Sequence, residues 1–240
     1  MSTPARRGLL RVSPEPIWPA NLTLRRALAL AYARPWNSHY DDANLKLMRG
    51  SSRFLRTCVD ELVSLGAPSV FSPPVPEANQ ELWRRAGFKV FLQLALLRLD
   101  LSQAVTDPAV AVTTTTDRDR VVAVDTAAFD RFWALGPAGI DEAMSSTPRS
   151  EILAVGEPLV GFAIVGHGHT ISYLQRVAVE PASQGRGFGT ALVLEAARRA
   201  RARANRTLFL NTQTDNEASL GIYERVGFKR MPEGLSLLQA

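Results

Sequence analysis

The sequence predicts an α/β protein in which strands and helices alternate, and three observations support this. Short apolar stretches separated by turn residues recur after residue 109, a glycine-rich loop joins one of them to a long helix, and part of the first half resembles part of the second. A turn-rich stretch around Asp107-Pro108 places a boundary near residue 108. We therefore expect two domains, residues 1–108 and 109–240.

Composition excludes several classes of protein. Hydrophobic residues make up 46% of the chain and charged residues 21%, which is typical of a globular protein and not of a disordered one. No apolar run approaches the roughly 18 residues that span a bilayer, and prolines interrupt the first twenty residues, so we expect no membrane segment and a cytoplasmic location. The single cysteine, Cys58, has no partner for a disulfide and no metal-ligand neighbours at a usual spacing. We expect a small buried side chain there and no metal site.

The net charge of +5 is carried by the first part of the chain. Residues 1–110 contain 14 Lys and Arg against 9 Asp and Glu, whereas residues 111–240 contain 14 against 14. One alternative function is therefore salt-dependent binding of nucleic acid or of an acidic partner through the N-terminal half. The basic residues do not form a run interleaved with aromatic residues, which argues against nucleic-acid binding.

Strand and helix patterns follow one another in the second half. Asp117 is a predicted N-cap residue of a helix. Short turns at Gly156-Glu157-Pro158 and His167-Gly168-His169 separate three successive strands, and they place both histidines at an exposed hairpin tip. The expected strands cover residues 110–112, 152–155, 159–165, 171–179, 208–210 and 235–238, and the expected helices follow Asp117 and cover residues 190–204 and 218–226.

The stretch from Val177 to Gly189 carries the clearest chemical pattern, because it places a strand, a turn and three glycines directly before the long helix. Glycine lets the backbone approach a ligand closely, so the amides of this loop converge on an anion site, which Arg186 and the positive end of the helix dipole reinforce. The nucleotide P-loop ends in Gly-Lys-Ser/Thr, which is absent here. The dinucleotide fingerprint needs an acidic residue after the next strand, where this sequence has Asn211.

The pattern Gln184-x-x-Gly187-x-Gly189 resembles the pyrophosphate loop of the GNAT superfamily, the acetyl-coenzyme A-dependent N-acetyltransferases. Asn216, Ala218 and Ile222-Tyr223-Glu224-Arg225-Val226-Gly227-Phe228 are similar to that family's second motif, and the resemblance covers residues 110–240. It implies a GNAT fold, a mixed and mostly antiparallel sheet flanked by helices. It also implies transfer of an acetyl group from acetyl-coenzyme A to a primary amine of a small molecule, a lysine or a protein N-terminus through a ternary complex. Protein N-terminal acetyltransferases of the ribosomal alanine type are the subgroup that the sequence resembles.

The resemblance implies roles for individual residues. The backbone of Val177, Ala178 and Val179 would bind the pantetheine arm and polarise the thioester carbonyl. Tyr223 would protonate the departing thiolate as general acid, and Asn216 would reach the pantetheine chain. The pyrophosphate would lie on the backbone amides of the loop, which are those of Gln184, Gly185, Arg186, Gly187, Phe188, Gly189 and Thr190.

The resemblance does not extend to a catalytic base. The positions where related enzymes often carry a glutamate are Tyr173 and Asn211 in this sequence. The remaining candidates are Glu180, Asp215, His167 and His169, or a water chain with no dedicated residue. Holding a neutral amine against the thioester is a further route that needs no base. The missing base also leaves open a non-catalytic acetyl-coenzyme A sensor or interaction module.

The first half contains a degenerate copy of the second. Residues 82–89, LWRRAGFK, align without a gap with residues 222–229, IYERVGFK, and Arg49-Gly50-Ser51-Ser52 aligns with Arg186-Gly187-Phe188-Gly189. Ser52 replaces the last glycine, and Trp83 stands where Tyr223 would act but has no hydroxyl. We therefore expect a tandem repeat with a structural N-terminal copy and a catalytic C-terminal domain. The sequence defines neither the acceptor nor the oligomeric state.

Overall fold

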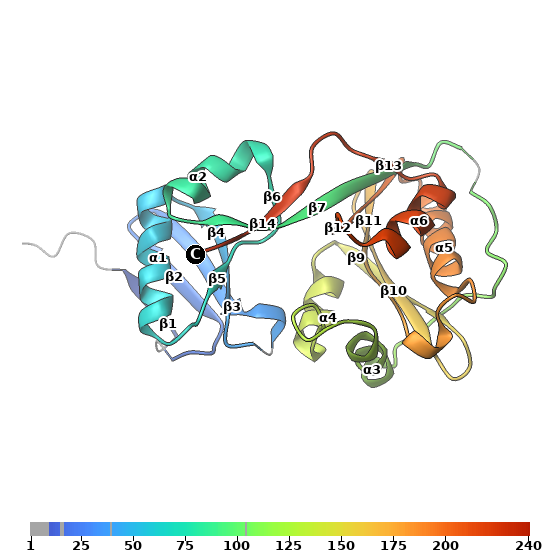
Figure 1. The fold of residues 1–240 in the computed structure, drawn as a ribbon, viewed down its shortest axis with the longest axis horizontal. Coiled ribbons are helices and arrows are strands. Elements are labelled where there is room, and N and C mark those ends of the chain that lie inside the picture. Colours follow the sequence, from blue (N-terminus) through green and yellow to red (C-terminus); the bar gives the residue numbers. More distant parts are fainter. Residues whose placement is uncertain (1–9, 15–16, 39, 104) are drawn as a thin grey trace, which may run out of the picture. The chain divides into compact units, whose positions relative to one another are not determined.

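The computed structural model describes residues 10–14, 17–38, 40–103 and 105–240 (Figure 1). They divide into two units, one with the described residues up to Leu94 together with Gly234–Ala240, and one with Ala95–Glu233. The division lies inside strand β7 (Lys89–Asp100), whereas the sequence places the boundary near residue 108. The strand contributes to both units because Leu94 pairs with Leu235 in the first and Arg98 pairs with Lys229 in the second.

The first unit contains helices α1 (Ser52–Ser64) and α2 (Gln80–Arg85) and a sheet with the strand order β1-β2-β3-β4-β5-β14-β7. Neighbouring strands are antiparallel except for β4 and β5, which are parallel. Cys58 on α1 is buried in the core, and burial raises the pKa of its thiol to about 12. The other elements of this unit are β1 (Arg11–Ser13), β2 (Leu22–Arg26), β3 (Ala29–Pro35), η1 (Trp36–Ser38), β4 (Ala43–Arg49), β5 (Val70–Phe71), β6 (Val75–Pro76), η2 (Glu77–Asn79) and β14 (Leu235–Gln239).

The second unit is a mixed sheet with the strand order β8-β9-β10-β11-β12-β7, and β13 pairs with β7. Strands β8 to β11 are antiparallel, and β11 is parallel to β12. The elements are β8 (Thr113–Thr114), α3 (Arg118–Ala128), α4 (Pro137–Ser145), β9 (Arg149–Val155), β10 (Gly161–His167), β11 (Ile171–Val179), η3 (Pro181–Ser183), α5 (Phe188–Ala202), β12 (Thr207–Gln213), α6 (Glu217–Val226) and β13 (Lys229–Arg230).

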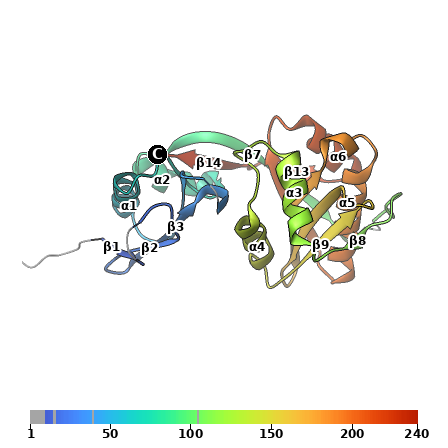
Figure 2. The same cartoon turned by 90° about the horizontal axis from the view of Figure 1, so that it is seen from below.

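Helices cover both faces of this second sheet. Side chains along a strand alternate between the two faces, so successive residues of one strand pack against different helices. Phe162 and Ile164 of β10 pack in a core cluster with residues of α3 and α4, which lie side by side (Figure 2). The alternate residues Ala163 and Val165 pack in a second cluster with residues of α5. Every residue of β10 is buried, as expected for a central strand. None of the helices in the described parts of the chain has the length and apolar character needed to cross a membrane.

The two aligned segments of the halves adopt the same local structure. Gly87 after α2 and Gly227 after α6 both have a φ of 103°, a left-handed conformation that ends each helix. The next residue, a phenylalanine in both halves, donates its amide hydrogen to the carbonyl oxygen of Trp83 or of Tyr223. Its ring lies 4.9 Å from the Trp83 ring and 5.7 Å from the Tyr223 ring, between centroids. The alignment found in the sequence therefore corresponds to a repeated structural motif.

The structure corrects one expectation for the second half and adds one helix. The strand expected over residues 110–112 occurs instead at Thr113–Thr114, which pair with β9. Val112 packs against the core without joining the sheet, which explains its apolar character. Helix α4 has no counterpart among the predicted elements. It begins directly after Gly136, with Pro137 in its first turn and no side-chain cap.

Candidate functional site

Strands β11 and β12 pair only over their first residues. Residues 171–173 of β11 pair in parallel with residues 207–209 of β12, and further along β11 the registered pairs are with β10 alone. A β-bulge lies where the register shifts, since Ile164 pairs with Arg176 and Val165 pairs with Leu174. A bulge bends a strand and increases its twist. In the described residues, one edge of the end of β11 is therefore left without a neighbouring strand.

The backbone of Val177 and Val179 faces this open edge. The amide of Glu180 donates to the carbonyl oxygen of Val160 at 2.9 Å, on the side of β10. Because the N–H and C=O of one residue point to the same side of a strand and successive residues alternate, those of Val179 and Val177 point to the opposite side. The Gln184 side-chain amide donates to the carbonyl oxygen of Val179 at 3.0 Å, which agrees with this direction.

The loop between β11 and α5 presents a row of backbone amides. Gly185 and Gly187 have φ values of 74° and 83°, a region that glycine adopts without strain. Gly187 is the N-cap residue of α5 and provides no side-chain cap. Within the described parts of the chain, no acceptor pairs with the amides of residues 185–190. Unpaired amides at the positive end of a helix dipole form a site for an anion.

These segments enclose a cavity of about 650 Å³. The space next to Gly185 and Gly187 is open, because an added Cβ would meet no atom within 4 Å at either position. Arg186 does not line the cavity; it is exposed, and its guanidinium carbon lies 5.3 Å from the centre of the Phe188 ring. All other residues predicted for the site line it, namely Val177, Ala178, Val179, Gln184, Gly185, Gly187, Phe188, Gly189, Thr190, Asn216 and Tyr223.

Tyr223 and Asn216 reach the cavity from α6. The Tyr223 side chain is buried, and this burial raises the pKa of its phenol to about 12, against the smaller opposing effect of a hydrogen bond with Ser219. The Asn216 side-chain oxygen caps α6 by accepting from the amide of Ser219 at 3.1 Å. Its side-chain nitrogen donates to the hydroxyl of Thr212 at 3.3 Å. Asn216 therefore also fixes the start of the helix that carries Tyr223.

The segment after α3 forms another wall of the cavity, which sequence reasoning missed. Phe129, Asp130 and Trp133 all line it, and Asp130 is the one carboxylate among the described lining residues. The Asp130 side chain accepts from the amide of Trp133 at 3.1 Å and is exposed. The sequence signal was an acidic residue set among aromatic residues just after a helix, Phe129-Asp130-Arg131-Phe132-Trp133.

A buried ion pair holds this wall to β11. Arg176 donates to both carboxylate oxygens of Asp125, at 2.6 and 2.9 Å, and to the carbonyl oxygen of Trp133 at 2.7 Å. Its guanidinium carbon lies 3.5 Å from the centre of the Phe129 ring, a cation–π contact. Asp125 also accepts from the amide of Leu135 at 2.6 Å. One side chain of β11 thus fixes the backbone and an aromatic ring of the opposing segment.

None of the base candidates taken from the sequence lines the cavity. Glu180 accepts from Arg120 at 2.6 Å and is held in that ion pair. Asp215, His169, Tyr173 and Asn211 are exposed.

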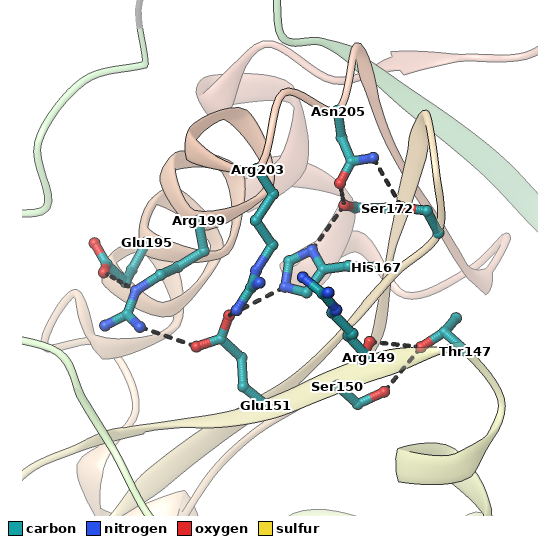
Figure 3. Close-up of polar contacts among 11 residues, drawn as sticks. Thr147, Arg149, Ser150, Glu151, His167, Ser172, Glu195, Arg199, Arg203 and Asn205 are labelled. Carbon is teal, nitrogen blue, oxygen red and sulfur yellow. Dashed lines mark hydrogen bonds and ion pairs between the residues drawn. The ribbon is translucent and has the colours of Figure 1, made fainter.

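The expectation that His167 lies at an exposed hairpin tip is wrong, although His169 does lie exposed there. His167 is buried, and its ring nitrogens lie 3.0 Å from the Glu151 carboxylate and 2.9 Å from the Ser172 hydroxyl (Figure 3). Burial lowers the pKa of His167, while the Glu151 hydrogen bond opposes this. The hydroxyl of Ser172 donates in turn to Asn205 at 2.7 Å. This chain of polar contacts explains why a histidine is buried there.

Residues 119–228 match the acetyltransferase (GNAT) family. The match covers 110 of the 240 residues of the chain. The GNAT match contains the glycine-rich loop, the open edge of β11 and the Tyr223 helix. It does not contain β7 or β13, although these two strands pair with each other in the same unit.

Several curated relatives of this chain are named as acetyltransferases. A mycothiol acetyltransferase of Amycolatopsis mediterranei is 27% identical over 210 residues, which are 76% of this chain and 68% of the relative. A mycothiol acetyltransferase of Rhodococcus erythropolis is 33% identical over 104 residues, 43% of this chain and only 34% of the relative's length. The N-alpha-acetyltransferase RimI of Mycobacterium tuberculosis is 34% identical over 101 residues, 40% of this chain and 61% of the relative.

A solved structure supports the arrangement of the fold. A tandem GNAT protein from the clavulanic acid biosynthesis pathway aligns with a TM-score of 0.65 at 12% sequence identity, and the alignment covers 98% of this chain and 83% of that one. At this identity the likeness concerns the fold alone. The α/β fold expected from the sequence, a GNAT fold in tandem, is confirmed.

Proposed function

We propose that the protein is an N-acetyltransferase that moves the acetyl group of acetyl-coenzyme A to a primary amine in a ternary complex, with no acyl-enzyme. One observation carries this proposal: the open edge of β11, the unpaired amides of residues 185–190 and the side chain of Tyr223 all border one cavity. A volume of about 650 Å³ is within the range of small-molecule sites, roughly 300–1,000 Å³.

The loop and the strand edge suit two different parts of acetyl-coenzyme A. The amides of residues 185–190 suit the pyrophosphate, because they are unpaired and lie at the positive end of α5. The N–H and C=O groups of Val177 and Val179 suit the amide groups of the pantetheine arm, which can pair with them as a further strand would. The fit is supported by the open space at Gly185 and Gly187, where the backbone lies directly against the cavity.

The same residues support a mechanism of direct attack. As the amine nitrogen bonds to the thioester carbon and the carbon–sulfur bond breaks, the backbone N–H groups of Val177 and Val179 stabilise the developing oxyanion. Tyr223 gives its phenolic proton to the departing sulfur and regains one from water, and the amine gives up a proton to water. A phenol with a pKa of about 12 keeps its proton throughout the neutral range. Burial also raises the pKa of a thiolate in the same cavity, which favours the transfer.

We further assign Asp130 to the acceptor. It is the one carboxylate among the described residues that line the cavity, and an amine acceptor arrives in neutral solution as an ammonium ion. An ion pair with Asp130 attracts this ion and holds it in the cavity, where it loses a proton before attack. Phe129 and Trp133, which line the same cavity, offer apolar surface to the carbon skeleton of the acceptor.

The acceptor belongs to one of the two classes that the names of the relatives suggest: a small molecule related to mycothiol, or the α-amine of a protein N-terminus. The test measures thiol release from acetyl-coenzyme A with both classes of acceptor and with lysine-containing peptides. We expect release with at least one acceptor and a kcat about 10²- to 10⁴-fold lower for Tyr223→Phe, with acetyl-coenzyme A affinity unchanged.

Two comparisons sharpen this test. Asp130→Asn should raise KM for the amine, whereas Asp119→Asn, an exposed carboxylate of α3 outside the cavity, should leave KM unchanged. Binding of acetyl-coenzyme A without thiol release from any amine would favour a sensor instead of an enzyme. A chain that fails to bind acetyl-coenzyme A at all contradicts the proposal.

A further inference from the structure

A second cavity, of about 780 Å³, lies next to the first and is markedly basic. It is lined by Arg98 of β7, Arg225 near the end of α6 and Lys229 of β13. Thr190 and Arg225 line both cavities, so the two lie next to each other at these residues. Thr190 is also the last residue of the row of unpaired amides at the start of α5, so the second cavity adjoins the proposed pyrophosphate site.

The positive charge of this second cavity is only partly balanced. Within the described residues, Arg98, Arg225 and Lys229 make no ion pair, and all three are exposed. Asp100 is the one carboxylate among the described lining residues. The amide of Ser102 donates to it at 2.9 Å and is the main cause of its lowered pKa, with smaller effects of Arg98 and Lys229. Three cations against one anion leave a net charge of +2.

We propose that this second cavity binds a phosphate monoester, the 3′-phosphate at the adenosine end of coenzyme A, and that it makes the protein selective for the 3′-phosphorylated form. The inference rests on the proposed function. With the pyrophosphate on residues 185–190, the part of the molecule beyond it continues past Thr190, toward Arg225. A phosphate monoester carries about −1.5 to −2 charges at neutral pH, which matches the excess charge of the cavity. Arginine binds such a group with two parallel hydrogen bonds.

Two of the three cations lie outside the segment that matches the GNAT family. Arg98 and Lys229 are neighbours across the β7–β13 pair, and the match covers residues 119–228. Strand β7 begins in the first unit of the chain, so the strand that leaves the N-terminal copy supplies one of the charges. The proposed selectivity therefore depends on the tandem organisation of this chain as well as on its GNAT domain.

The test compares the dissociation constants of coenzyme A and of 3′-dephospho-coenzyme A by isothermal titration calorimetry with the full chain. We expect the wild type to bind coenzyme A roughly tenfold to hundredfold more tightly, the range for hydrogen bonds to a charged group. Arg98→Gln and Lys229→Gln should each reduce this ratio while leaving the affinity for the dephospho form unchanged. Arg230→Gln, the next residue on β13 and not part of the cavity lining, should keep the wild-type ratio.

The outcomes separate this inference from the proposed function. Equal affinities of the wild type for the two ligands would overturn the second cavity as a phosphate site and leave the acetyltransferase proposal standing. Failure to bind either ligand would overturn both. If the ratio of the two dissociation constants stays at the wild-type value in both Arg98→Gln and Lys229→Gln, the 3′-phosphate lies elsewhere. Since both side chains are exposed, the variants should fold as the wild type does, which thermal unfolding checks.

Discussion

The Asp125 carboxylate and the Arg176 guanidinium form a bidentate ion pair, with nitrogen–oxygen distances of 2.6 and 2.9 Å, and the Asp125 side chain is 0% exposed. Arg176 directly precedes Val177, the first predicted cofactor-binding residue. The pair therefore connects the end of α3, and with it the segment that carries Asp130, to the strand that borders the cavity. It is a link between the two walls of the site.

Removing one partner should be costly, because a buried charge is then left without compensation. Asp125→Asn should lower the free energy of unfolding by about 3–5 kcal/mol, as measured by urea titration. Asp141→Asn is the matched control, since Asp141 is exposed and its ion pair with Arg118 is longer, at 3.7 Å. That change should cost less than about 1 kcal/mol. Equal losses in the two variants would contradict the structural role of the Asp125–Arg176 pair.

The anion site at the start of α5 is tested most directly at Gly187. Asn and Asp both tolerate a positive φ and have the same shape, so they differ in charge alone. Gly187→Asp should bind acetyl-coenzyme A roughly tenfold or more weakly than Gly187→Asn, because its carboxylate faces the pyrophosphate. The difference should shrink as salt is added. Equal affinities of the two variants would count against a pyrophosphate at this loop.

Features set by neighbouring residues were predictable from the sequence. Asp117 caps α3 as expected, accepting from the amide of Arg120 at 3.0 Å. The glycines of the loop were recognised because their conformations are local, and so was Gly227 at the end of α6. The residues of the cavity could be grouped in advance because a strand, a loop and a helix that follow one another in sequence stay together in space.

Features set by distant contacts were not predictable. Asp125 and Arg176 are 51 residues apart, and their pairing depends on how α3 packs on the sheet. Asp130 lines the cavity from the segment after α3, which the same Arg176 side chain contacts at Trp133. The final strand was predicted, but its partner was not, since Leu235 pairs with Leu94 of β7 in the first unit. No local pattern in the sequence carries such information.

His167 should make the stability of the fold depend on pH. Burial is the largest cause that sets its pKa below the ordinary 6.5; the nearby Arg203 and Arg199 lower the pKa further, and the Glu151 hydrogen bond opposes this shift. As pH falls below about 6.5 the unfolded chain binds a proton before the folded one does, so stability is full above this pH and is lost as pH falls through the folded-state pKa. Urea titrations at pH 7 and pH 5 measure the loss. His167→Gln should remove this part of the dependence, whereas His169→Gln, at the exposed tip, should retain it.

The two halves should differ in what they bind, because the loop of the N-terminal copy is filled by its own side chains. Ser51 is the N-cap residue of α1, and its hydroxyl accepts from the amide of Phe54 at 3.3 Å, whereas Gly187, the N-cap residue of α5, has no side chain to do so. The Phe54 ring also packs against Gly50. We expect calorimetry to give one acetyl-coenzyme A per chain. Trp83→Tyr, which restores a hydroxyl in the first copy, should leave this number at one, since the anion site stays filled. A stoichiometry of two in either protein would mean that the N-terminal copy has kept a working site.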